Sequence, residues 1–316
     1  MNIEKIFDYA RENNISDIHL LEGEKIYFRK DGEIIEYDGT DTVSKEELLE
    51  ICNGKIEEDF AYTDSKSQRY RANSFLTRGK LALVIRIINK EPIKLKGKFI
   101  NKLIDEKILS LKDGLVLVTG ITGSGKSTTL ANIIEKFNEN KNLKILTIED
   151  PIEYIFENKK SLIIQRELGK DVESFEKALK GSLRQDPDVI ILGEIRDEES
   201  LYSALKLAET GHLVFSTLHT MNTVESVNRL ISMVRTEKKD FIREQLASVL
   251  RFILSQDLHR GKKTFPIFEI LNNTKAVANL ILNNKLNQIP TLIESGIENF
   301  MITKAKYLKN LETESD

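Results

Sequence analysis

The chain has 316 residues, of which 40% are hydrophobic and 31% charged, and its formal net charge is −3 at pH 7. Such a composition is typical of a soluble globular protein with two ordinary domains, and it excludes a mainly disordered chain. The near balance of charge gives no overall basic excess for binding nucleic acid or an anionic membrane. We therefore expect no nucleic-acid partner.

The cysteine content and the lengths of the apolar runs indicate in which cellular compartment the protein is found. Cys52 is the single cysteine, so we expect no internal disulfide and no cysteine-rich zinc site, and a core position for Cys52 in a reducing compartment. The amino terminus lacks the uninterrupted apolar run of a secretory signal, and no run reaches the roughly 18 apolar residues of a membrane span. We expect no export, and membrane contact only through a partner.

The first 90 residues predict a small α/β domain with two hairpins. Asp31-Gly32 is typical of a two-residue hairpin turn in which both residues need a positive φ. Residues 77–80 join the second pair of strands. The segments expected as strands are 25–30, 33–37, 69–76 and 81–88, with a helix at 44–52 between the hairpins. A polar stretch from 89 to 98, with Pro92 and Gly97, predicts a linker.

From about residue 100, strand and helix patterns alternate, which predicts a parallel sheet with helices on both faces. The expected strands are 115–119, 144–148, 189–192 and 213–218, and the expected helices begin at 126 or span 172–183 and 197–210. Gly211 has the place of a residue that terminates the last of these helices.

The carboxyl-terminal third predicts mainly helices. An apolar stripe that includes Ile242, Leu246 and Ile253 predicts one helix over 238–258, the longest in the chain, with His259 at its end. A short strand at 264–270 and helices around 276–282 and 290–294 follow. The fold class is therefore α/β, with a small domain and linker at 1–97 and a P-loop domain with a helical carboxyl-terminal part at 98–316.

Residues 120–128 read Gly-Ile-Thr-Gly-Ser-Gly-Lys-Ser-Thr, the P-loop pattern, between an apolar strand and a helical pattern. Backbone N–H groups surround a phosphate there, and the helix amino terminus adds a positive field. We expect Lys126 to reach the β and γ phosphates of ATP and the Ser127 hydroxyl to ligate Mg²⁺. The predicted nucleotide-binding residues are Gly120, Thr122, Gly123, Ser124, Gly125, Lys126, Ser127 and Thr128. A flexible Gly-Ser loop is the alternative.

Residues 188–194, Asp-Val-Ile-Ile-Leu-Gly-Glu, predict a buried strand that ends in a carboxylate, as a Walker B segment does, although Gly193 stands where an aspartate is usual. Ligands of open α/β sheets bind at this end of the strands. We expect Glu194 to activate or position the attacking water, directly or through the Mg²⁺ shell. A surface acid that caps the next helix is the alternative.

A second acidic pair, Glu149-Asp150, follows the strand at 144–148 and precedes Pro151. Because parallel strands end at the same edge of a sheet, these carboxylates approach the same phosphates. Either can hold a Mg²⁺-bound water or polarise the nucleophile, and we favour Glu149. The alternative is a simple acidic turn before proline.

His212 and His219 flank the strand at 213–218. Their odd separation places them on opposite faces, which argues against a shared metal. We expect one histidine to sense the γ-phosphate or its water and the other to pack at a subunit boundary. Purely structural roles are the alternative.

Arg71, Arg78 and Arg86 fall on the second hairpin. Hydrolysis of ATP develops negative charge on the γ-phosphate, and an arginine from another domain or subunit accelerates such reactions by roughly 10³ to 10⁵. We expect these arginines to supply that charge, and surface solvation is the alternative.

These motifs together resemble the secretion ATPase superfamily and, within it, the PilT-like type IV pilus retraction ATPases. The resemblance covers nearly the whole chain. Its most specific parts are an acidic box and a histidine box that follow the P-loop in this order. The segments that carry it are 15–20, the P-loop, 147–154, 183–188 with 193–197, 208–215 with 217–220, and 246–251.

The resemblance implies a homohexameric ring, with a PAS-like first domain and a RecA-like ATPase domain in each subunit. It implies a cytoplasmic location, peripheral to the inner face of the cell membrane. It also implies that Glu149 and Glu194 act in catalysis, that both histidines are functional, and that the hairpin arginines approach ATP across a ring interface. The expected function is hydrolysis of Mg-ATP to drive pilus retraction and twitching motility through an inner-membrane pilus assembly platform protein.

Two departures from the family pattern keep other functions open. Ile121 replaces a usual proline, which removes only a φ restriction. Residues 276–283 lack the charged signature of retraction motors, although Gln288-Ile289-Pro290 is present. The alternatives are an extension or type II secretion assembly ATPase, which usually adds a longer amino-terminal region and a four-cysteine metal site, a non-motor ATP-binding regulator, and a DNA-translocating ring.

Overall fold

The computed structural model describes residues 3–30, 32–39, 42–66, 68–88, 92–260 and 264–315. These residues fall into two compact units. The first contains Met1–Glu91 together with Pro151–Ile155, and the second contains Pro92–Asp150 together with Phe156–Asp316. Each unit has its own sheet and its own hydrophobic core.

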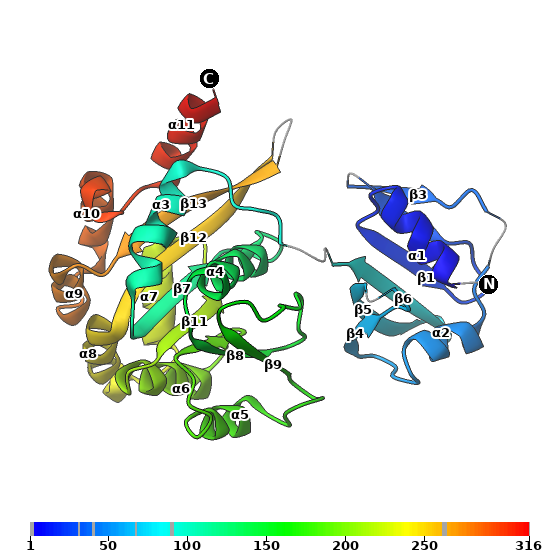
Figure 1. Cartoon of the computed structure of the whole chain (residues 1–316), viewed down its shortest axis with the longest axis horizontal. Helices are drawn as coiled ribbons and strands as arrows, with labels where there is room; N and C mark the ends of the chain where they lie inside the picture. Colours follow the sequence, from blue (N-terminus) through cyan, green and yellow to red (C-terminus); the bar gives the residue numbers. More distant parts are fainter. Residues whose placement is uncertain are drawn as a thin grey trace. The chain divides into compact units, whose positions relative to one another are not determined.

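The first unit is built on a six-stranded antiparallel sheet in the order β3-β2-β1-β6-β5-β4 (Figure 1). Its strands are β1 (Asp17–Leu21), β2 (Tyr27–Lys30), β3 (Glu33–Glu36), β4 (Asp59–Thr63), β5 (Arg69–Thr77) and β6 (Lys80–Ile87). Helices α1 (Ile3–Glu12) and α2 (Lys45–Ile51) contribute apolar side chains to its core. Cys52 is fully buried in the same core, as predicted.

Local sequence explains the turns and the helix of this unit. Arg78 and Gly79, between β5 and β6, have φ of 51° and 77°, the backbone that a two-residue hairpin turn requires. In the first hairpin Gly32 has φ of 89°, whereas Asp31 lies outside the described residues. Helix α2 begins at Ser44, whose hydroxyl accepts a hydrogen bond from the Glu47 N–H in a capping box. Both predicted hairpins and the helix between them are confirmed.

The second unit contains a seven-stranded sheet in the order β13-β12-β7-β11-β10-β8-β9. Six neighbouring strands are parallel, and β13 is antiparallel to β12. The strands are β7 (Gly114–Thr119), β8 (Lys144–Glu149), β9 (Leu162–Glu167), β10 (Val189–Leu192), β11 (Leu213–Leu218), β12 (Leu250–Arg260) and β13 (Thr264–Asn272). The four strands predicted from the alternating pattern form its centre, so the α/β fold class is confirmed.

Helices pack on both faces of this sheet. They are α3 (Lys98–Glu106), α4 (Lys126–Asn140), α5 (Phe175–Ser182), α6 (Glu198–Glu209), α7 (Thr223–Ser232), α8 (Lys239–Val249), α9 (Lys275–Leu282), α10 (Ile289–Ser295) and α11 (Lys304–Ser315). Short 3₁₀ helices span Ile108–Ser110, Thr236–Lys238, Leu286–Gln288 and Ile297–Asn299.

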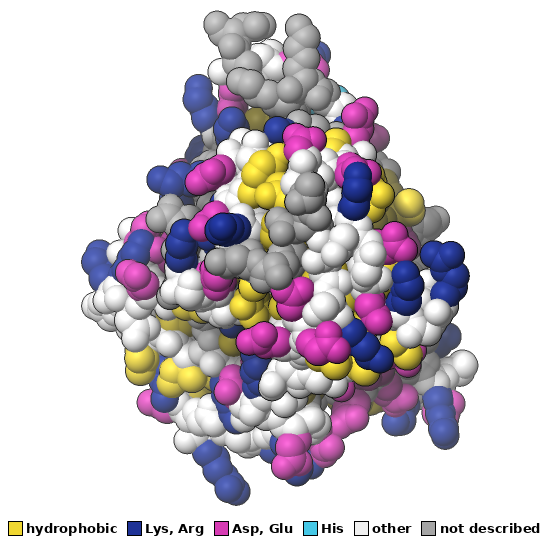
Figure 2. Space-filling view, turned by 90° about the vertical axis from the view of Figure 1, so that its right-hand side faces the viewer, with side chains coloured by type: hydrophobic (Ala, Val, Ile, Leu, Met, Phe, Trp, Pro, Cys, Tyr) yellow, Lys and Arg dark blue, Asp and Glu magenta, His cyan; other side chains and the backbone are white. Residues whose placement is uncertain are grey.

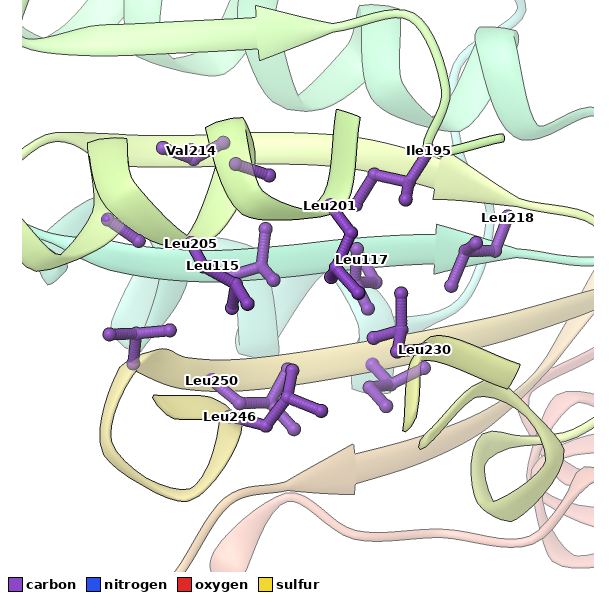
Figure 3. Packing of buried hydrophobic residues seen from close by; sticks show 14 of the residues in the cluster. Leu115, Leu117, Ile195, Leu201, Leu205, Val214, Leu218, Leu230, Leu246 and Leu250 are labelled. Atoms are coloured by element: carbon purple, nitrogen blue, oxygen red, sulfur yellow. The ribbon is translucent and has the colours of Figure 1, made fainter. Parts of the chain in front are cut away.

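The two faces of β7 bury different helices because strand side chains alternate. Leu115 and Leu117 pack with residues of α6, α7 and α8, including Leu201, Leu230 and Leu246 (Figure 3). Val116 and Val118 pack on the other face with residues of α3 and α4. This double burial holds the strand that leads into the P-loop.

The predicted helix at 238–258 is wrong beyond its first half. Helix α8 ends at Val249, and Leu250 has the extended backbone that starts β12. The strand lies between β7 and β13, and its buried apolar residues include the short run Phe252-Ile253-Leu254. Such a run fits a buried helix as well as a buried strand, and periodicity alone does not separate them. His259 accordingly lies on a strand.

Most other predicted elements of the carboxyl-terminal third are confirmed, since β13, α9 and α10 cover the predicted segments. In the described part of the chain every helix is too short or too polar to cross a membrane. On the face that Figure 2 shows, acidic and basic side chains are interspersed, in keeping with the near balance of charge in the sequence.

Candidate active site

The P-loop connects the buried strand β7 to helix α4. Gly120, Gly123 and Gly125 have φ of 151°, 77° and 84°, which are values that glycine adopts without the strain of a side chain. Helix α4 begins at Lys126, so the N–H groups of its first turn have no partners within the helix. The loop therefore has the backbone of an anion-binding site.

Lys126 is folded into this loop. Its side chain is largely buried, and its ammonium donates hydrogen bonds to the carbonyls of Gly120, at 2.8 Å, and Ile121, at 3.0 Å. A phosphate that binds in the loop competes with these carbonyls for the ammonium. Thr122 and Ser127 are exposed, which leaves their hydroxyls accessible to a ligand.

Four neighbouring parallel strands bring the predicted catalytic groups to one edge of the sheet. In the order β7, β11, β10 and β8, their carboxyl ends lead to the P-loop, His219, Glu194 and Glu149. Strand register keeps these ends level, because Thr119 pairs with Leu218 and Leu192 pairs with Ile148. The edge is the place where open α/β sheets bind their ligands.

A chain of polar contacts joins three of these strand ends. His219 Nε2 lies 2.9 Å from a carboxylate oxygen of Glu194, and His219 Nδ1 lies 3.4 Å from the Thr122 hydroxyl in the P-loop. The second Glu194 oxygen forms an ion pair with Arg196, whose guanidinium also lies 3.7 Å from Asp150. The P-loop is thus linked through His219 and Glu194 to the acidic end of β8.

The proton positions on His219 follow from its partners. Burial, together with the positive charges of Lys126 and Arg196, lowers the pKa of His219 below its usual 6.5. The imidazole is therefore neutral at pH 7. Because a carboxylate only accepts, Nε2 carries the proton and donates to Glu194, and Nδ1 accepts from the Thr122 hydroxyl.

Glu149 is held at the end of β8 by two polar neighbours. The Thr147 hydroxyl, two residues earlier on the same face of the strand, donates to the Glu149 carboxylate at 2.6 Å. The amide of Gln165, on β9, donates to the same oxygen at 3.2 Å. These contacts orient the carboxylate at the ligand-binding edge.

His212 lies at the opposite edge of the sheet from His219. It precedes β11, and its Nδ1 lies 3.1 Å from both the Leu207 carbonyl and the Thr210 hydroxyl at the end of α6. The structure therefore brings only one histidine of the predicted pair to the P-loop. The structural contacts of His212 fix the turn between α6 and β11.

The three predicted arginines lie on one hairpin of the first unit. Arg71 and Arg86 are direct cross-strand partners on β5 and β6, and Arg78 is in the turn between these strands. Arg86 Nε lies 2.8 Å from the Asp17 carboxylate, and Arg71 lies 3.9 Å from Asp59. The approach of these arginines to ATP stays a prediction.

Sequence reasoning missed two polar residues of this edge. Arg196 follows Glu194 by two residues, and this spacing could have indicated that the two side chains share a site. Gln256 on β12 bonds the P-loop, but the sequence places it in a predicted helix, which conceals its position.

Comparison with known proteins shows the family of this chain. The family model for the type II/IV secretion system proteins matches residues 1–285. The chain belongs to this family.

Its relatives within the family include pilus motors. A twitching motility protein of Neisseria gonorrhoeae is 41% identical over 85% of this chain and 73% of its own length. The type IV pilus retraction ATPase PilT of Pseudomonas aeruginosa is 35% identical over 98% and 94% of the two chains. A crystal structure of the pilus retraction motor PilT with bound ADP superposes with a TM-score of 0.87 at 35% identity, over 99% of this chain and 94% of that one.

The residues of this family member fit a magnesium ion that is held jointly with a nucleotide. Among the described residues, no three His, Cys, Asp or Glu side chains gather closely enough to hold a metal by themselves. Mg²⁺ usually takes one or two protein oxygens and completes its shell with substrate phosphates and water. The Ser127 hydroxyl at the start of α4 is exposed, and Glu149 and Glu194 follow strands that end at the same edge of the sheet, which meets that requirement.

Proposed function

We propose that this chain is a motor ATPase that hydrolyses Mg-ATP to drive retraction of a type IV pilus. The observation that carries the proposal is the contact chain from Thr122 through His219 to Glu194, which couples the P-loop to a carboxylate at a neighbouring strand end. Its full-length likeness to a retraction ATPase, at 35% identity, supports the direction of the work.

The chemistry assigned to each residue follows from its place. Backbone N–H groups of the P-loop and the Lys126 ammonium bind the phosphates, and the Ser127 hydroxyl would hold Mg²⁺. A bound Mg²⁺ would neutralise charge on the phosphate oxygens. Glu194 orients the attacking water and accepts a proton from it, whereas Glu149 polarises this water or would hold a water bound to the ion. His219 fixes the position of the Glu194 carboxylate.

We further propose that six copies form a ring, in the cytoplasm at the inner face of the cell membrane, where they act on a pilus assembly platform protein. Arg71, Arg86 and Arg78 then supply positive charge to a nucleotide, and His212 lies near a subunit boundary. A head-to-tail interface between copies would allow this arrangement, since it lets one subunit complete the site of its neighbour.

Deletion of the gene tests the direction of work. A retraction motor predicts cells with excess surface pili that do not retract, and wild-type protein supplied in trans restores retraction. A complementing copy with Glu194→Gln leaves the pili extended. Absence of pili in the deletion strain would instead favour the extension ATPase, a function that stays in competition because residues 276–283 lack the charged signature of retraction motors.

A non-motor regulator is the other candidate, because Gly193 replaces the usual Walker B aspartate. Such a protein binds ATP without turning it over at a useful rate. Steady-state ATP turnover by the purified wild-type protein separates this function from a motor.

A further inference from the structure

Gln256 is a buried amide whose place beside the P-loop is set by strand register. Ser255 on β12 pairs with Thr119, the last residue of β7, so Gln256 lies level with the start of the loop. The side chain is almost completely buried, with 2% exposed. A buried carboxamide is costly unless its donors and acceptor are used.

Both ends of this amide are bonded to the P-loop and the helix that follows it. Gln256 Nε2 donates to the Ser124 carbonyl at 2.5 Å, and Oε1 accepts from the Thr129 hydroxyl at 2.6 Å. The orientation of the amide is fixed because a carbonyl only accepts. Gln256 therefore bridges the last turn of the loop and the first turn of α4.

The loop backbone lies directly against this residue. A Cβ atom at Gly120 would lie 2.3 Å from the Gln256 carbonyl oxygen, and one at Gly125 would lie 2.9 Å from Nε2. Only glycine allows such an approach at these two positions. Strand β12 thus contacts the P-loop at both of its ends.

We propose that Gln256 is a positioning residue for nucleotide binding. In a trans peptide the C=O and the following N–H point in opposite directions. By holding the Ser124 carbonyl, Gln256 directs the Gly125 N–H away from β12 and toward the space that a phosphate occupies. The inference rests on the proposed nucleotide binding at the P-loop.

The test is ADP binding by Gln256→Leu, measured by calorimetry alongside thermal unfolding. Losing both bonds leaves the Ser124 carbonyl and the Thr129 hydroxyl without partners, so the Kd of ADP rises by about tenfold to a hundredfold. Asn273→Leu is the matched control. The Asn273 amide donates to two backbone carbonyls, those of Ala247 and Leu250, at the far end of β12, so its loss lowers the melting temperature without changing the Kd.

Gln256→Glu keeps the size of the side chain and adds a pH-dependent readout. An ionised carboxylate still accepts from Thr129 but repels the Ser124 carbonyl, whereas the protonated acid donates to that carbonyl as the amide does. The ratio of the variant Kd to the wild-type Kd therefore falls as pH is lowered from about 8 to about 6, because burial raises the pKa of such a carboxyl group.

Three outcomes are decisive. A folded Gln256→Leu protein with the wild-type Kd overturns the inference, as does a Kd ratio for Gln256→Glu that does not change with pH. If Gln256→Leu does not fold, the pH dependence of the Kd ratio for Gln256→Glu tests the inference. Failure of the wild-type protein itself to bind ADP would contradict the proposed function instead.

Discussion

The imidazole of His219 acts in this site as a neutral group with one donor and one acceptor. Nε2 donates to Glu194 and Nδ1 accepts from Thr122, so a single tautomer serves both contacts. Protonation turns Nδ1 into a donor. The Thr122 hydroxyl can then keep its hydrogen bond only by rotating to accept. Protonation also adds a positive charge beside Lys126 and Arg196. Burial of the ring, together with those two cations, lowers the pKa of His219 and favours the neutral form.

ATP turnover should therefore fall in acid. Because the pKa of His219 is lowered from 6.5, we expect the loss to be centred below that pH. His219→Gln keeps a donor and an acceptor but has no proton to gain, so its pH profile should lack this acid limb. The same limb in the variant would assign the titration to another group. Steady-state turnover between about pH 5 and pH 8 makes the comparison.

The free energy of unfolding should also decrease as the pH is lowered. The unfolded chain binds a proton at His219 at a higher pH than the folded chain does, because the folded pKa is lowered. This contribution to the free energy of unfolding is fully present above pH 6.5, the usual pKa, and is lost as pH falls through the folded value.

Individual site residues could be predicted where they follow a strand. Glu194, Glu149 and His219 come directly at or after apolar strands, and parallel strands end at one edge. Their mutual contacts could not be predicted, because these depend on strand order, which places β11 and β10 between β7 and β8. The contribution of Arg196 also depends on that order.

The two glutamates at the ends of β8 and β10 should both be needed for ATP turnover. Glu149→Gln and Glu194→Gln each remove a carboxylate that can take a proton while keeping the shape of the side chain. We expect ATP turnover to fall by about 10² to 10⁴ in each, with ADP affinity close to that of the wild type. Turnover and calorimetric binding on the same preparations check this. Unchanged turnover in both variants would make these carboxylates structural.

Strands and helices were predicted correctly where capping or terminating residues mark their ends. Ser44 and Asp197 begin helices with side-chain caps, and Gly211 ends one with φ of 93°. Edge strand β9 lacks such signals, and the short apolar run of β12, Phe252-Ile253-Leu254, directly follows the apolar stripe of α8. The parallel partner of β12, β7, is distant in sequence, so the local pattern could not distinguish β12 from a continuation of α8.

The whole molecule combines an antiparallel α/β unit with a P-loop unit whose sheet is parallel apart from β13. Composition and alternating patterns predict this fold class. The family assignment needs the ordered set of motifs, from the P-loop to the histidine box, and it is confirmed by a family match over residues 1–285. In the ring that we propose, the hairpin arginines would supply charge to a neighbouring subunit's nucleotide.

The central claim is that a nucleotide binds at the loop ahead of Lys126 and is hydrolysed there. The most direct measurement is ATP turnover and ADP binding by Lys126→Ala. We predict loss of turnover and a rise of about tenfold to a hundredfold in the Kd of ADP, because a charged hydrogen-bond donor to phosphate is removed. Wild-type turnover and affinity in a folded Lys126→Ala protein would contradict the account.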